Sequence, residues 1–145
     1  FQMAKRICGV QMYKNPIGIL LFIVAMVSTQ VVWAAERMVK IVEPVNNAQL
    51  SSPVKVCMEV SGLIIEKAKK GVNEGRGHHH LLLNSLPVDL SQPIGKQEIH
   101  MGDGSECKEL KFVPGSHVIY TVFAYGNHVP YDPAITDRII ITIKD

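Results

Sequence analysis

The stretch His117-Val-Ile-Tyr-Thr-Val-Phe-Ala-Tyr125 is the longest strand candidate in the chain, filled with β-branched and aromatic residues between two glycine turns. Similar runs, each closed by turn-forming residues, occur at 38–43, 54–60, 78–83, 97–101, 107–112 and 138–144. Seven strands without a convincing helix predict an all-β fold, an antiparallel immunoglobulin-like β-sandwich. A small barrel or jelly roll is the alternative.

Two other stretches between these runs are expected to be irregular. Residues 63–77 carry charges and three glycines, and they predict a solvated excursion with at most one helical turn, at 64–70. The segment that begins at Gly126-Asn127 and runs through Pro130 and Pro133 is predicted to be a loop.

Residues 1–34 are typical of a secretory signal peptide. Basic residues precede an apolar core at 17–27, and Val32 and Ala34 occupy the −3 and −1 positions of a cleavage site. The alternative is an uncleaved anchor, because the apolar segment has almost the ~20 residues that cross a bilayer. We therefore expect one domain at 35–145, periplasmic or secreted, and held at a membrane only if the leader stays uncleaved.

The apparent basicity of the chain belongs to this leader. The 145 residues include 15 Lys and Arg against 13 Asp and Glu, a net charge of +2. From Ala35 onward the balance is 12 against 13, a net charge of −1. A domain without a basic excess has little attraction for phosphates, which excludes nucleic acid as the main partner.

Removal of the leader leaves two cysteines, Cys57 and Cys107. In an oxidising compartment an even pair predicts one disulfide, which would stabilise the domain by ~4 kcal/mol in the chain-entropy model. The alternative is two buried thiols in separate strands. A metal site made of cysteines alone is not expected, because the chain has no Cys-x-x-Cys motif.

All six histidines lie after the leader. In an extended strand His78 and His80 share a face, ~6–7 Å apart, while His79 points the other way. Two further histidines beside turns complete a site if their loops meet this strand, so the predicted metal ligands are His78, His80, His100 and His128. Imidazole suits copper and zinc, and the thioether of Met101 would favour Cu(I).

The alternative for these histidines is structural: each hydrogen-bonds a backbone carbonyl, caps a turn or responds to pH. The competing function is then a metal-free binding or assembly module that docks a cell-envelope protein through a sheet face or strand edge. Three imidazoles aimed at one point would favour the metal, whereas scattered histidines bonded to backbone would favour docking.

Catalysis has little support in the sequence. The serines of the domain lie in turns, and no Gly-x-Ser-x-Gly elbow is present. The segment Gly102-Asp103-Gly104-Ser105 lacks the ligand spacing of a calcium loop. We expect no catalytic residues, no organic cofactor and no enzymatic activity.

Several segments resemble the DUF4399 family of small exported bacterial domains: 44–52, 54–57, 77–83, 99–102, 114–117 and 127–133. The Gly-His-His-His-Leu element at 77–81 is the most specific of them. This chain has Tyr131 where a further histidine is expected, and Cys107 is not typical of the family. The resemblance implies an exported β-domain, and it implies no reaction, since the family has no established biochemical activity.

Overall fold

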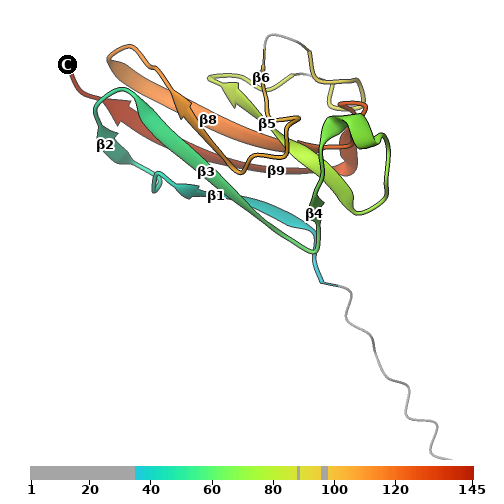
Figure 1. Ribbon diagram of the computed structural model, residues 1–145. Helices are drawn as coiled ribbons and strands as arrows, with labels where there is room; N and C mark the ends of the chain where they lie inside the picture. The colour runs from blue at the N-terminus through green and yellow to red at the C-terminus, as the bar shows by residue number, and fades with distance from the viewer. Residues whose placement is uncertain (1–34, 88, 96–97) are drawn as a thin grey trace, which may run out of the picture. The chain divides into compact units, whose positions relative to one another are not determined.

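The computed structural model describes residues 35–87, 89–95 and 98–145. Within these residues the protein is an all-β sandwich, as its sequence predicts, with two sheets that share one hydrophobic core (Figure 1). The predicted signal peptide at 1–34 lies outside the described part of the chain. No helix among the described residues is long and apolar enough to span a membrane.

The smaller sheet is antiparallel and contains three strands among the described residues. Its order is β1 (Met38–Glu43), β3 (Val54–Ser61) and β7 (Cys107–Leu110). Val54, Val56 and Met58 alternate with outward-facing residues along β3, and all three are buried. This period of two turns one face of the sheet towards the core.

The larger sheet contains six strands in the described residues. Its order is β2 (Ala48–Leu50), β9 (Pro130–Ile143), β8 (Gly115–Ala124), β5 (Arg76–Leu83) and β4 (Ile64–Ile65), with β6 (Ile99–His100) also paired to β5. The pairs β2–β9 and β4–β5 are parallel and the others are antiparallel. The fold therefore has nine strands in this part of the chain, where the sequence predicts seven.

β2 and β4 are the two additional strands, and two segments expected to be irregular contain strand residues. β4 lies in the segment expected to be an irregular excursion, while a 3₁₀ helix, η1 (Ala68–Lys70), is the single helical turn that the sequence allows there. β9 begins at Pro130, inside the predicted loop, and a register shift opposite Phe123 and Ala124 takes up the extra residues. Strands of two or three residues are too short to show alternation, so tertiary pairing alone defines them.

The main core lies between the two sheets. It is built from the inward-facing residues of both, including Met58, Leu81, Met101, Ile119 and Ile141. A second, smaller cluster lies on the other face of the larger sheet and consists of Leu82, Ile94, Val122 and Ala124. That outer face is therefore covered by chain around Ile94, and it is this covered face that carries the candidate site.

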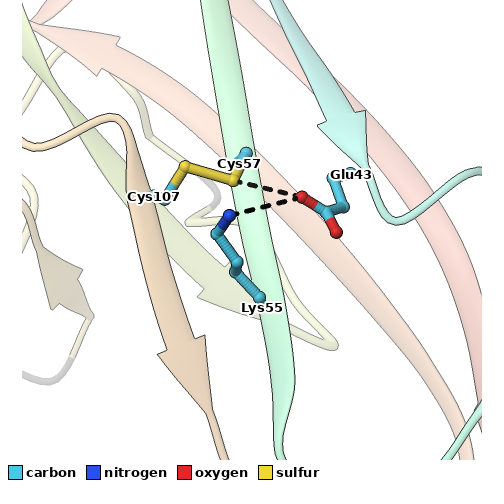
Figure 2. Close-up of a disulfide and its surroundings, with 4 residues drawn as sticks. All are labelled: Glu43, Lys55, Cys57 and Cys107. Atoms are coloured by element: carbon cyan, nitrogen blue, oxygen red, sulfur yellow. Dashed lines mark hydrogen bonds and ion pairs between the residues drawn. A yellow bond between two sulfur atoms is a disulfide. The ribbon is translucent and has the colours of Figure 1, made fainter.

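A disulfide joins Cys57 of β3 to Cys107 of β7, as the sequence predicts (Figure 2). The two residues face each other in register, and their Cα atoms are 4.1 Å apart. The Glu43 carboxylate lies 3.5 Å from Cys57 Sγ and 3.7 Å from the Lys55 ammonium. A disulfide sulfur has no proton to donate, so only the contact with Lys55 is an attractive ion pair.

Candidate metal centre

Strand β5 sends its three consecutive histidines to opposite faces of the larger sheet. His79 faces the core, where its ring packs edge-on against Phe123 at 5.4 Å. His78 and His80 face outward beside Ala124 and Val122, their register partners on β8. All three side chains are at most 1% exposed, so the outer pair is as deeply buried as the inner one.

Strand β6 adds a third imidazole to the outer pair. His100 is the register partner of His80, which places both side chains on the same face. The Nε2 atom of His78 lies 3.0 Å from that of His80 and 3.2 Å from that of His100. Two nitrogens bound to one tetrahedral zinc ion are about 3.3 Å apart, so these spacings fit a shared ion.

The fourth imidazole comes from the loop between β8 and β9. His128 has a positive φ of 69°, a conformation held by a hydrogen bond from its N–H to the Tyr125 carbonyl at 2.8 Å. Its own carbonyl accepts a bond from the Ile94 N–H at 2.9 Å. The ring of His128 lies 4.6 Å from that of His100 and 5.2 Å from that of His78, centre to centre.

The structure therefore brings together the four residues that the sequence singles out as metal ligands. One nitrogen from each of His78, His80, His100 and His128 lies within 4.8 Å of the other three. His117 is elsewhere, bonded through Nε2 to the Val113 carbonyl at 2.8 Å. Two of the four ligand side chains are buried, His128 is half-buried and His100 is exposed.

Backbone contacts that the sequence does not reveal hold His100 and His128 in place. The Ala68 N–H of η1 donates to the Gly102 carbonyl at 2.9 Å, and Gly126 packs directly on the Gly71 carbonyl. A Cβ atom at Gly102 would lie 2.1 Å from the His100 ring. Gly102 is thus required for space, and a glycine two residues after a histidine is too weak a signal to identify from sequence.

A cleft of about 480 Å³ opens beside the imidazoles. It is lined by His80, His100 and His128, together with Pro93, Ile94 and Gly95. The exposed ring of His100 and the half-buried ring of His128 lie at this side of the cluster. An ion that enters from solvent would therefore meet the rings of His100 and His128 first.

The sequence of the domain matches a known protein family. The family model described as a domain of unknown function, DUF4399, matches residues 56–144. The chain belongs to the DUF4399 family. All four candidate ligands lie inside the matched region, as do Cys57 and Cys107.

Other comparisons add little to this DUF4399 domain. No curated protein matches its sequence. A solved structure with some likeness is the X-ray structure of the endo-beta-1,4-mannanase from Thermotoga petrophila, with 12% sequence identity and a TM-score of 0.43. The match covers 76% of this chain and 20% of that one, so the domain spans about a fifth of the mannanase.

Burial keeps the imidazoles of His78 and His80 in the DUF4399 domain neutral. Desolvation, together with the neighbouring imidazoles, lowers the pKa of His78 to about 4 and that of His80 to about 3. Desolvation and His128 also lower the pKa of His100, against a smaller opposing effect of Asp103. Metal-bound imidazole must be neutral, so at neutral pH these residues have lone pairs free for an ion.

The buried nitrogens of the cluster lack ordinary hydrogen bonds. The Nδ1 atoms of His78 and His80 have no partner among the described residues, and their Nε2 atoms face other imidazoles. Two neutral imidazole nitrogens can share one proton only if one donates and the other accepts. A cation among the Nε2 atoms would take up the lone pairs that now face one another, and each Nδ1 atom would carry the proton. The facing Nε2 atoms therefore fit a metal ion.

Met101 does not take the role that the sequence suggests for it, and Tyr131 supplies no ligand in place of the missing histidine. Met101 is 1% exposed and packs in the core between the sheets, whereas the imidazoles lie on the outer face of the larger sheet. Its thioether therefore does not support Cu(I) binding. Tyr131 stacks on Tyr125 at 3.9 Å and donates to the Arg76 carbonyl, so it takes no part in the cluster.

Proposed function

We propose that this protein is an exported, non-enzymatic β-sandwich module that binds a divalent transition-metal ion through His78, His80, His100 and His128. The observation that carries the proposal is the approach of four imidazoles from three segments to within one ligand sphere. Nitrogen donors of this kind suit zinc and copper and are poor ligands for magnesium or calcium.

The arrangement favours metal binding over the metal-free docking module. Docking predicts scattered histidines that each bond a backbone carbonyl. In the described part of the chain only His117 has such a side-chain bond, to Val113. The other histidine outside the cluster, His79, packs in the core, with Thr121 at 3.5 Å from its Nδ1 atom.

Export is supported by two independent features. The leader pattern at 1–34 has the parts of a secretory signal, and the Cys57–Cys107 disulfide is typical of an oxidising compartment. Mass spectrometry of the protein from its native host tests this part. A mature N-terminus at Ala35 is expected, and an intact mass that retains earlier residues would mean an anchored module.

Calorimetric titration of the purified protein with Zn(II) and Cu(II) at pH 7.5 tests the binding itself. We expect one ion per chain, with affinity lowered at least about 100-fold in His78→Ala and His100→Ala, because each variant removes a ligand. His117→Ala is the matched control, since it removes a histidine outside the cluster. Equal binding in all four proteins would make the histidines structural and favour docking.

A further inference from the structure

The four imidazole rings lie at the corners of a nearly regular tetrahedron. All six distances between ring centres fall between 4.6 and 5.4 Å. They are 4.8 Å for His78–His80, 4.9 Å for His78–His100, 5.2 Å for His78–His128, 5.2 Å for His80–His100, 5.4 Å for His80–His128 and 4.6 Å for His100–His128.

These distances discriminate between coordination geometries. Four imidazoles on one tetrahedral ion, with metal–nitrogen bonds of ~2.05 Å, have all six pairs of ring centres about 5.2 Å apart. In a square plane, four pairs would be about 4.5 Å apart and the two diagonal pairs about 6.4 Å. The longest observed distance is 5.4 Å, so no pair of rings is diagonal.

The chain restrains the rings against flattening into a plane. His78 and His80 are fixed two residues apart on β5, and both are buried. His100 is held in register opposite His80 and confined by Gly102, while backbone bonds on both sides hold His128. The most distant ligand nitrogens, now within 4.8 Å, would have to approach to about 3.3 Å around a tetrahedral ion.

The donor set contains nitrogen only. Met101 is packed in the core, and the nearby Asp103 carboxylate already accepts bonds from the N–H and hydroxyl of Ser105 at 3.0 and 2.7 Å. Among the described residues, the candidate ligand group includes no thiol to select Cu(I) and no carboxylate to select magnesium or manganese. Zinc has no electronic preference for any geometry and accepts a tetrahedral site, whereas Cu(II) and Ni(II) prefer square-planar or tetragonal sites.

We propose that the site is a closed, four-coordinate zinc centre in which His78, His80, His100 and His128 supply all four ligands. This inference rests on the proposed function and names its metal and geometry. A closed shell keeps no position for a reacting water, which is the arrangement of structural rather than catalytic zinc. The exposed cleft side of the cluster then serves for loading and release of the ion.

Substitution of Co(II) for Zn(II) in the purified protein is the deciding experiment. A four-coordinate site gives Co(II) the intense visible absorption of a tetrahedral complex, and X-ray absorption of the zinc form should show four nitrogens at ~2.0 Å. Cu(II) in the same site should show an EPR spectrum distorted away from the tetragonal form. The His128→Ala variant should admit water as the fourth ligand, so its cobalt spectrum should change with pH as that water ionises, whereas the spectra of the unaltered protein and of His117→Ala should not.

The outcomes separate the two proposals. Tight binding with a weak, six-coordinate cobalt spectrum, or an ordinary tetragonal copper spectrum, would overturn the closed zinc centre and leave metal binding intact. Binding of none of these ions would overturn both. If His128→Ala does not fold, the cobalt and X-ray absorption spectra of the unaltered protein still decide the geometry.

Discussion

The disulfide and the histidine cluster both join segments that are far apart in the chain, but they do so by different means. Cys57 and Cys107, 50 residues apart in sequence, lie in paired strands and are held by a covalent bond. The four histidines come from two strands and a loop, and glycine contacts and backbone bonds hold them. The disulfide should therefore support the fold, while the cluster should respond to protons and metal.

Acid should have the largest effect, and it should act on the histidines. The pKa values of His78, His79 and His80 are lowered by burial to about 4, 4 and 3 in the folded protein, against 6.5 in the unfolded chain. Below pH 6.5 the unfolded chain binds more protons, so stability falls as pH drops towards 4 and is fully present above 6.5. Each pKa unit corresponds to about 1.4 kcal/mol.

Urea unfolding of the metal-free protein at pH 7.5, 6, 5 and 4 measures this slope. Zinc should add stability at pH 7.5 and lose that effect as protons displace it. A stability that is flat between pH 7 and 4 would contradict neutral, buried imidazoles. The disulfide contributes nothing to the slope, because its sulfurs do not titrate.

Removal of the disulfide should be the next largest change. The double variant Cys57→Ser, Cys107→Ser should lose about 4 kcal/mol of unfolding free energy, because its unfolded chain is no longer cross-linked. Its zinc affinity should match that of the unaltered protein, since the bond joins strands of the other sheet. A large loss of zinc affinity in the folded variant would show that the two regions are coupled.

A smaller effect is expected when the cluster is disturbed without loss of a ligand. In Gly102→Ala the new Cβ would lie 2.1 Å from the His100 ring and push it out of place. Zinc affinity should fall about tenfold, or ~1.4 kcal/mol, by calorimetric titration. Gly104→Ala is the control in the same turn: its φ of 82° strains alanine, but no histidine lies near the added atom.

The smallest effect is expected from the inward-facing histidine. His79 has an Nε2 atom without a partner in the described residues, so His79→Leu removes a buried polar group and keeps a similar volume. Unfolding free energy at pH 7.5 should change by less than about 1.5 kcal/mol in either direction, and zinc affinity should be unchanged. A lost zinc site would mean that the core side of β5 also controls the cluster.

Local patterns in the sequence determined most of the sandwich. The alternation of apolar and polar residues defines β1 and β3, because successive side chains of a strand point to opposite faces of the sheet. The same rule separates His79 from His78 and His80 before any contact is known. The even pair of cysteines likewise predicts its disulfide.

The sequence singles out the four candidate ligands, but only the tertiary structure decided that they meet. The approach of His100 and His128 to β5 depends on pairing between distant segments and on the tight spaces at Gly102 and Gly126. Met101 lies in the core because of tertiary packing, and its position beside a turn in the sequence does not predict this. The all-nitrogen donor set follows from that core position. Periodicity is a property of neighbours in sequence, whereas coordination geometry is a property of neighbours in space, and only the folded chain brings the second set together.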